Sequence, residues 1–485
     1  MVEGAGKRAV ILGAGVAGLA TALRLAEGGG WRPRLLERED RPGGLARSLH
    51  FRGVSTDLGP HRIHTEIPEV QALIESVAAR SLVRLRRSSH IFLGKKWLTY
   101  PPRPLELLGA LGPIRMARFG TGFALEKLRP RPAQETYESL MRAAFGGPLW
   151  EFLLRPYSAK TWKIDPGELH ADTARVRVSA GSLGKLVAGL LRREQQGAET
   201  ALREFRYVKG GAETLVRHLW AAAHAAGAEL ELNTAVQELE LDERGRVRAA
   251  LALRRPAHGT AEGADQRFEG ELFVSTVPLP ILLGRLLPQR AELMAAREAA
   301  ARLEYLDMAF VCLIVRRKVI TGDNWLYFPE PHLIFNRGYE AKSFDPAMAP
   351  EDKSVICLEI TMRRGDALAR ESDALILQTA TEHIVSTGLF RKEEIEEGLV
   401  YRIPYAYPLY KLDYDVQLGK VLAGLRGLGN LVTLGRQGLF NHNNMDHSIW
   451  MGLQAADKLN SYETAEAVAA WYDRADDFKR MRIVD

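Results

Sequence analysis

The N-terminal part of the chain alternates apolar runs with short glycine-rich turns. Residues 8–12 form a continuous apolar run that predicts a buried strand. After the turn GAGVAG, an alanine- and leucine-rich stretch to about Ala26 predicts a helix, which the glycines at 28–30 end. Residues 34–37 predict a second strand. This order of strand, helix and strand indicates a βαβ unit.

Beyond this unit the pattern is first helical and then mostly strand-like. Residues 70–200 are predicted to be mainly helical, with breaks at prolines. Further helices are predicted at 214–226, 369–390 and 446–459, and an amphipathic helix in the tail 461–485. Strands are predicted at 228–234, 236–241, 247–253, 271–279 and 431–435. Residues 301–361 alternate apolar and polar positions in several runs, which predicts an antiparallel sheet.

Composition restricts the class of protein. The chain has 485 residues, of which 46% are apolar, and this length favours two to four domains. A net charge of +6 is compatible with an anionic small-molecule substrate and equally with an ordinary basic surface. The sequence contains neither a concentrated basic stripe nor a nucleic-acid-binding module, so nucleic acid is not an expected partner.

Cysteine usage and hydropathy suggest where the protein acts. Cys312 and Cys357 show no metal-ligand or disulfide spacing, so we expect no metal, a reducing compartment and a cytoplasmic location. No signal-peptide pattern is present, and no apolar run reaches the roughly 18 residues of a transmembrane helix. Segment 91–132 mixes apolar and basic residues. A core-packed helix with a basic rim is the expectation there, and peripheral membrane contact is the alternative. The oligomeric state is left open.

The turn after the first strand has the spacing of a phosphate-binding loop. Gly13, Gly15 and Gly18 form the pattern G-x-G-x-x-G between a strand and a helix. The first glycine permits a tight turn, the second lets a pyrophosphate approach the backbone, and the third lets helix and strand pack closely. Free N–H groups at the helix N-terminus favour phosphate. Glu37 ends the second strand, where its carboxylate can accept hydrogen bonds from ribose hydroxyls and would repel a 2′-phosphate.

The residues after Glu37 decide between dinucleotides. The segment RPGGLARS contains Gly43, Gly44 and Arg47, and it resembles the extended FAD fingerprint of the amine oxidase superfamily. Glycines there let backbone approach the cofactor, and an arginine can neutralise pyrophosphate. The resemblance implies FAD as the cofactor. Because neither cysteine lies in a flavin-attachment context, we expect non-covalent binding.

Five further segments resemble UDP-galactopyranose mutase and its flavoprotein relatives, which include protoporphyrinogen oxidase-like and amine oxidase-like enzymes. They occur in the family's order and extend the resemblance over most of the chain, from residue 8 to about 459. The segments are GPHRIHT at 59–65, YSAKTW at 157–162, DPGEL at 165–169, FNRGYEAKSF at 335–344 and GRQGLFNHNNMDH at 435–447.

The resemblance implies roles for particular residues. Together with the loop residues, the implied cofactor-binding residues are Gly13, Gly15, Gly18, Glu37, Gly44, Arg47, His61, Val236, Gly435, Arg436, Met445 and Asp446. The implied substrate-binding residues are Tyr157, Trp162, Arg175, Arg337 and His442, and the implied catalytic residues are His64, Arg337 and Arg436. For the two histidines, a structural imidazole is the alternative.

Several of these roles have a simple physical basis. The flat faces of Tyr157 and Trp162 suit a nucleotide base, and the arginines suit phosphates and the flavin. Arg175 follows Trp162 at a spacing one residue shorter than in the family, so Arg177 stays open as its replacement. The helix beginning near Asp446 would point its N-terminus at the flavin and favour the anionic reduced form.

Departures from the mutase pattern keep two functions open. His442 replaces a tyrosine of the mutases, and the segment LEYLDM at 303–308 lacks a family arginine. The first function is a mutase-like reaction on a sugar nucleotide or similar anionic glycosyl substrate, in which flavin N5 is a nucleophile and NAD(P)H is one candidate reductant. The alternative is an oxidoreductase of the amine oxidase, protoporphyrinogen oxidase or desaturase type, in which hydride passes from a C–H or C–N bond to the flavin.

The predicted fold class is α/β, and α+β overall. We expect a discontinuous Rossmann-like FAD-binding domain with a parallel sheet at 1–75, 205–285 and 420–460. A mainly helical substrate region would occupy 76–204, an antiparallel-sheet substrate domain 286–419, and a C-terminal helix 461–485.

Overall fold

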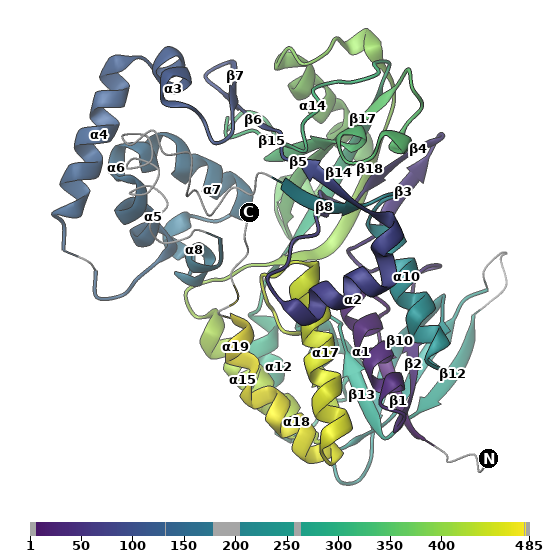
Figure 1. Cartoon of the computed structure of the whole chain (residues 1–485). Coiled ribbons are helices and arrows are strands. Elements are labelled where there is room, and N and C mark those ends of the chain that lie inside the picture. The colour runs from purple at the N-terminus through teal and green to yellow at the C-terminus, as the bar shows by residue number, and fades with distance from the viewer. Residues whose placement is uncertain (1–5, 131, 178–203, 257–262, 480, 482–485) are drawn as a thin grey trace.

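A five-stranded parallel sheet forms one end of the molecule (Figure 1). The computed structural model describes residues 6–130, 132–177, 204–256, 263–479 and 481. In spatial order the strands of this sheet are β19 (Leu431–Thr433), β13 (Leu272–Ser275), β1 (Lys7–Leu12), β2 (Trp31–Leu36) and β9 (Glu229–Glu231). Every neighbouring pair is parallel. The predicted βαβ unit is confirmed, and strands from distant parts of the chain complete the sheet.

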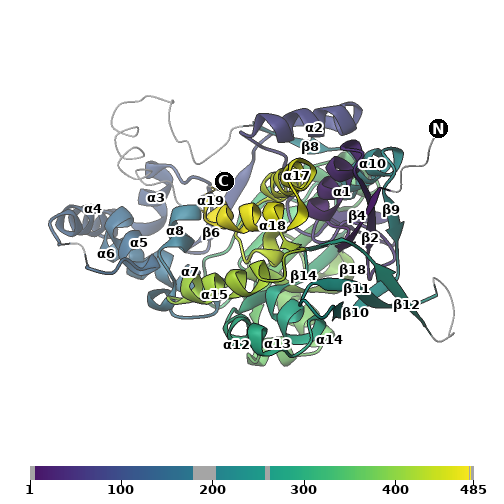
Figure 2. The same ribbon diagram turned by 90° about the horizontal axis from the view of Figure 1, so that it is seen from below.

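Three helices lie side by side next to this sheet (Figure 2). They are α1 (Val16–Glu27), α10 (Ala212–Ala225) and α17 (Met445–Ser461), and α1 packs against both of the others. A Cβ on Gly452 would lie 2.5 Å from the carbonyl oxygen of Ala17, so the glycine permits this close approach of α17 to α1. A separate antiparallel sheet contains β10 (Thr234–Leu241), β11 (Val247–Arg254) and β12 (Ala264–Glu269). Two further helices pack together, α12 (Met294–Ala301) and α15 (Tyr414–Arg426).

A seven-stranded sheet forms the other end. In spatial order its strands are β18 (Ile395–Pro408), β14 (Tyr305–Val315), β17 (Ser354–Arg363), β16 (Arg337–Glu340), β15 (Trp325–Tyr327), β6 (Ser89–Leu93) and β7 (Lys96–Thr99). The antiparallel sheet predicted at 301–361 is confirmed for β14 to β17. Both faces of its central strands β14 and β17 are buried. Helix α14 (Asp373–Ser386) covers one of these two faces.

A helical lobe stands beside the seven-stranded sheet (Figure 1). Its helices are α3 (Pro104–Leu111), α4 (Pro113–Lys127), α5 (Tyr137–Phe145), α6 (Gly147–Leu149), a π-helical turn at Trp150–Leu154, α7 (Arg155–Trp162) and α8 (Asp172–Arg177). The largely helical prediction for 70–200 is wrong at β5 (Leu82–Arg86), β6 and β7. These apolar runs become strands because each finds a partner elsewhere: β5 pairs with β8 (Glu204–Val208), and β6 pairs in parallel with β15.

The remaining elements connect these layers. Strands β3 (Ser48–Phe51) and β4 (Val54–Asp57) form a hairpin, and α2 (Pro68–Ala78) packs against α10 and α17. The tail contains α18 (Thr464–Asp473) and α19 (Ala475–Lys479), where one helix was predicted. Within the described parts of the chain, every helix is too short or too polar to cross a bilayer.

Candidate active site

A cavity of about 1480 Å³ runs from the carboxyl ends of the parallel strands, past the seven-stranded sheet, into the helical lobe. The ends of β1 and β2 and the turn after β13 line one end of it. Ligands of open α/β sheets bind at this edge. The volume exceeds the range of about 300–1,000 Å³ typical of small-molecule pockets. The cavity therefore has room for a dinucleotide and a substrate together.

At Gly13 and Gly15 the glycine-rich loop presents its backbone to the cavity. Gly13 has φ 102°, and a Cβ there would lie 2.3 Å from Oγ1 of Thr276. Gly15 forms a bridge with Gly43, and both line the cavity. A Cβ on Gly18 would lie 2.2 Å from the carbonyl oxygen of Gly13, so this glycine serves the packing of α1 against β1. Helix α1 begins next to the cavity at Val16, where its free N–H groups favour phosphate.

Glu37 lies at the end of β2 and lines the same part of the cavity. Its Oε2 accepts a hydrogen bond from the backbone N of Ala14 at 2.9 Å, and its Oε1 accepts one from Glu39 N at 3.1 Å. Burial raises the pKa of this carboxyl, although both backbone hydrogen bonds act in the opposite direction. Each carboxylate oxygen keeps a lone pair for a further donor. This buried acid beside an open glycine loop fits the ribose and pyrophosphate of FAD.

Arg47 and Gly44 continue the wall beside Glu37. The Nε of Arg47 donates to the carbonyl oxygen of Gly44 at 3.0 Å, and its second guanidinium nitrogen donates to Tyr401 Oη at 3.1 Å. Its remaining nitrogen lies 3.4 Å from Oε2 of Glu39. These contacts hold the guanidinium at the cavity, while Gly44, at φ 59°, follows a left-handed backbone.

The C-terminal segment supplies the facing wall. Gly435 and Arg436, in α16 (Gly435–Gly438), line the cavity together with Val236 and Met445. The guanidinium of Arg436 donates to the carbonyl oxygens of Asn443 and Ala406 and stacks on the ring of Tyr407, 4.9 Å from the ring centre. Helix α17 begins at Met445, so its N-terminal dipole is directed at this wall. Asp446 is buried one position further along and is not among the described lining residues.

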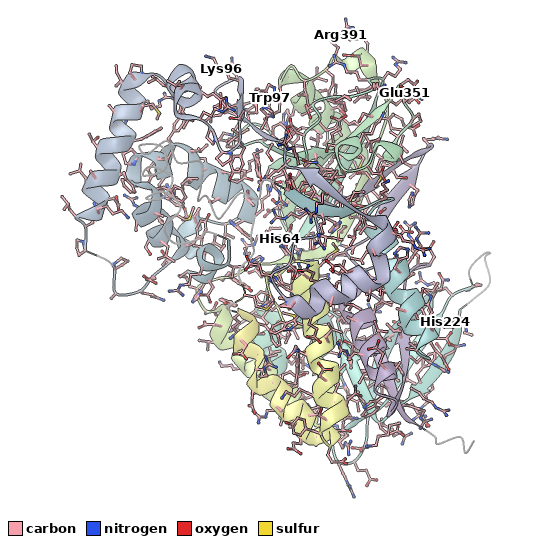
Figure 3. All side chains as sticks on the ribbon, viewed as in Figure 1. His64, Lys96, Trp97, His224, Glu351 and Arg391 are labelled. Carbon is pink, nitrogen blue, oxygen red and sulfur yellow. The ribbon has the colours of Figure 1, made fainter. Side chains whose placement is uncertain are left out.

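His61 lines the cavity close to Arg436. Burial, followed by the charge of Arg436, lowers its pKa to about 4. The imidazole is therefore neutral near pH 7, and its Nδ1 has no hydrogen-bond partner among the described residues. His64, labelled in Figure 3, lies on a separate pocket of about 240 Å³. Arg84 and Arg206 also line that pocket. The structure thus brings His61, and not His64, to the main cavity.

Arg337 reaches the cavity from β16 as half of a buried ion pair. Its Nε donates to Oε2 of Glu359 at 3.0 Å, and a second nitrogen donates to the same oxygen. Only 1% of the Glu359 side chain is exposed. Tyr157 and Tyr407 line the cavity beside this pair. The guanidinium charge of Arg337 is thereby neutralised within the protein.

Three predicted substrate residues do not line the cavity within the described part of the chain. Trp162 and His442 are buried together, edge to face, with ring centres 5.2 Å apart. Arg175 is half-exposed on α8, where Asp172 and Glu135 bind its guanidinium. Acidic partners on its own helix and on the segment before α5 hold Arg175 away from the cavity. The side chain of Arg177 lies outside the described residues.

One part of the cavity, lined by residues between 91 and 154 and called the apolar arm below, was not predicted from the sequence. The lining contributed by the described residues between 91 and 154 contains no charged side chain. On α4 it consists of Met116, Phe119, Gly120 and Phe123. These positions follow the spacing i, i+3, i+4, i+7, which marks one face of a helix. That spacing was the available signal, although it does not tell a cavity wall from a packed core.

Comparisons with known proteins agree with this geometry. The model of the family described as flavin containing amine oxidoreductase matches residues 16–402. Protoporphyrinogen oxidase 2, chloroplastic/mitochondrial, of Arabidopsis thaliana is 26% identical over 202 residues, which are 39% of this chain and only 39% of that protein.

Many solved structures share the fold, among them a mutase and an isomerase. Reduced UDP-galactopyranose mutase aligns over 97% of this chain and 98% of its own, with 20% identity and a TM-score of 0.78. A CLA-producing fatty acid isomerase from P. acnes aligns over 93% of this chain and 98% of its own, with 17% identity and a TM-score of 0.61.

Proposed function

This chain belongs to the flavin-containing amine oxidoreductase family and is an FAD-dependent enzyme, and we propose that it oxidises a largely apolar small molecule. When bound, FAD accepts a hydride from a substrate C–H bond, which in an amine is the C–H bond next to nitrogen. The glycine loop, Glu37 and the N-terminus of α1 would hold the dinucleotide. Gly435, Arg436 and the start of α17 line the cavity and would contact the flavin.

The apolar arm carries this proposal. Its described lining between residues 91 and 154 is free of charge, and it includes aromatic rings such as Phe119, Phe123 and Phe145. Burying apolar substrate surface against such a wall is favourable by roughly 25 cal/mol per Å². A nucleoside diphosphate placed there would lose the hydration of its charged phosphates without gaining ion-pair partners. Burying an unpaired ion in this way costs on the order of several kcal/mol.

The charged groups at the inner end of the arm have a different role. The ion pair of Arg337 with Glu359 leaves Oε1 of Glu359 without a hydrogen-bond partner among the described residues. That oxygen is itself buried, but Arg337 and Glu359 both line the cavity and the Arg337 side chain is 23% exposed, so the guanidinium is placed to donate a hydrogen bond to a polar group of the substrate. The neutral His61 offers a second acceptor or donor on the same cavity. These groups orient a single polar end and leave the apolar body in the arm.

A mutase-like reaction on an anionic glycosyl substrate is the second candidate. Arg436, Arg337 and Tyr157 support it, because all three line the cavity. In this case NAD(P)H would serve as the reductant that activates the flavin. Neutralisation of Arg337 by Glu359 and the position of Arg175 outside the cavity weigh against it.

One anaerobic experiment separates the two candidates. The oxidised holoprotein is mixed without oxygen with long-chain unsaturated lipids, porphyrinogens and amines, and the absorbance of oxidised flavin is followed. We expect an apolar compound to bleach the flavin and oxygen to restore it. If no compound does so, and the dithionite-reduced protein isomerises a sugar nucleotide without net oxidation, the oxidoreductase proposal is wrong.

A further inference from the structure

Helix α4 lies at the outer edge of the helical lobe in both ribbon views (Figures 1 and 2), and α3 lies at the top of the lobe in Figure 1. The cavity-lining positions of α4 are spaced as one helix face, and Leu107 and Leu111 of α3 line the same arm. Ile114, Arg118 and Leu125 are spaced i, i+4 and i+11 on the other side of α4 and are exposed. The helix pair therefore has one face on the cavity and one on solvent.

The solvent side of this pair is unusually apolar. Half of the exposed large hydrophobic side chains among the described residues lie between 100 and 128, a small fraction of the chain. Ile114 is 86% exposed, Leu128 82% and Leu105 81%, and none of the three lines the cavity. Single exposed apolar residues are ordinary, but such a group on one edge marks an interaction surface. We call the exposed residues of 103–129 the outer face.

Basic residues surround these apolar side chains. They are Lys96, Arg103, Arg118 and Arg129, all exposed. Arg115 lies over the ring of Phe152, and Lys127 lies over the ring of Phe123 and donates to the carbonyl oxygen of Ala143. Lys96 lies on the same edge (Figure 3) and donates to the carbonyl oxygen of Gly109 at 3.0 Å. The two acidic residues of α3 and α4 are engaged by protein groups: Glu106 accepts from Thr99 Oγ1 at 2.6 Å, and Glu126 lies near Arg129 and Arg142. The outer face is thus positively charged as well as apolar.

We propose that the outer face binds the surface of an anionic lipid bilayer. Leucine and isoleucine side chains would enter the boundary between headgroups and acyl chains, and the surrounding lysines and arginines would contact anionic headgroups. A second copy of this chain fits less well, because two outer faces would bring like charges together. The contact proposed is peripheral, with the outer face at the boundary between headgroups and acyl chains.

The position of the apolar arm connects the membrane contact with substrate entry. This connection rests on the proposed function. Tyr100 and Pro101 line the cavity and are themselves exposed, so the arm reaches the surface at the edge of the outer face. A lipophilic substrate dissolved in the bilayer would enter the arm there without passing through water. The membrane contact itself requires no particular reaction.

Vesicle flotation of the FAD-loaded protein tests the contact directly. The probes are vesicles of pure phosphatidylcholine and vesicles with about a third phosphatidylglycerol, because anionic lipid supplies the attraction. We expect the protein to float with anionic vesicles at low salt and to lose at least tenfold in binding at high salt or with phosphatidylcholine alone. No substrate is added, so the result does not depend on the proposed reaction.

Two double variants make the test specific. Ile114→Asp with Leu128→Asp should reduce vesicle binding at least tenfold with unchanged flavin content and melting temperature. Leu375→Asp with Val416→Asp is the matched control, because both residues are exposed and apolar but lie on α14 and α15. Equal binding by the two double variants overturns the proposal. The proposal is also overturned if the wild type does not bind anionic vesicles, or if it self-associates through Ile114 and Leu128 instead.

Discussion

The carboxylate of Glu37 accepts a hydrogen bond from the backbone N–H of Ala14, with 2.9 Å between Oε2 and N. This contact joins the end of β2 to the middle of the glycine-rich loop. It fixes the loop beside an acid that is largely hidden from water, at the place where a dinucleotide ribose is expected. The loop and the acid therefore act as one structural unit, and changing the acid should disturb both.

Replacing Glu37 with glutamine should weaken FAD binding at least tenfold. Hydrogen bonds to a charged acceptor contribute about 1.5–3 kcal/mol, and each factor of ten is about 1.4 kcal/mol. The amide would also direct a donor at the backbone N–H of Ala14 or Glu39. The measurement is the dissociation constant of FAD from a titration of the apoprotein.

Glu229→Gln is a suitable control for this change. Glu229 lies on the neighbouring strand β9, exposed and paired with Arg34. It should bind FAD like the wild type. Unchanged affinity in Glu37→Gln would show that the ribose assignment is wrong.

The dinucleotide half of the site could be predicted because its signal is local. Gly13, Gly15 and Gly18 are spaced by the geometry of one turn and one helix start, and Glu37 ends the next strand. Strands β13 and β19 were also visible as short apolar runs, because a strand covered on both faces needs apolar residues throughout. Only their place in the sheet required the structure.

The substrate half could not be predicted, because its signal depends on tertiary packing. Tyr157 and Trp162 are five positions apart on α7, which separates them by about 140° around the helix. They therefore cannot both face one cavity, and Trp162 packs against His442 instead. His61 and His64 lie in a segment without regular structure, so no periodicity tells which of them faces the cavity.

An aspartate in the apolar arm should selectively harm turnover of an apolar substrate. Leu153 lines the arm and is partly buried, so Leu153→Asp places a carboxylate where an apolar substrate would lie. We expect at least a tenfold loss in kcat/KM with unchanged flavin content. Steady-state kinetics with the substrate that bleaches the flavin would measure it, with Leu375→Asp as the exposed control.

The Arg337–Glu359 pair should prove more important for stability than for phosphate binding. Arg337→Met leaves the carboxylate of Glu359 buried without its cation, a change that typically costs about 3–5 kcal/mol. Adding Glu359→Gln removes the uncompensated charge, so the double variant should recover much of the loss. Denaturant unfolding of the three holoproteins measures both steps.

A different outcome would favour the mutase-like candidate. In that case Arg337→Met would unfold like the wild type and raise the KM for a sugar nucleotide at least tenfold. The guanidinium would then contribute its charge to a substrate phosphate and not to Glu359.

Asp57 should make stability fall as pH rises through mildly acidic values. Its carboxylate, which is 3% exposed, accepts hydrogen bonds from Ser48 Oγ at 2.6 Å, Tyr207 Oη at 2.7 Å and Ala212 N at 3.0 Å. Burial outweighs these hydrogen bonds and raises the pKa of Asp57 from 3.8 to about 6. The folded protein thus holds this proton in a pH range where the unfolded chain has released it.

The sign of the effect follows from proton linkage. The contribution of Asp57 is fully present below about pH 4 and is lost as pH rises to about 6, a change on the order of 3 kcal/mol. Asp57→Asn stays neutral throughout, so its free energy of unfolding relative to the wild type should rise by about 2 kcal/mol between about pH 4.5 and pH 7, because part of the contribution is already lost at pH 4.5. Asp265→Asn, an exposed position on β12, serves as the control. A wild-type-to-variant difference that is equal at both pH values would mean that Asp57 is ionised in the folded protein throughout this range.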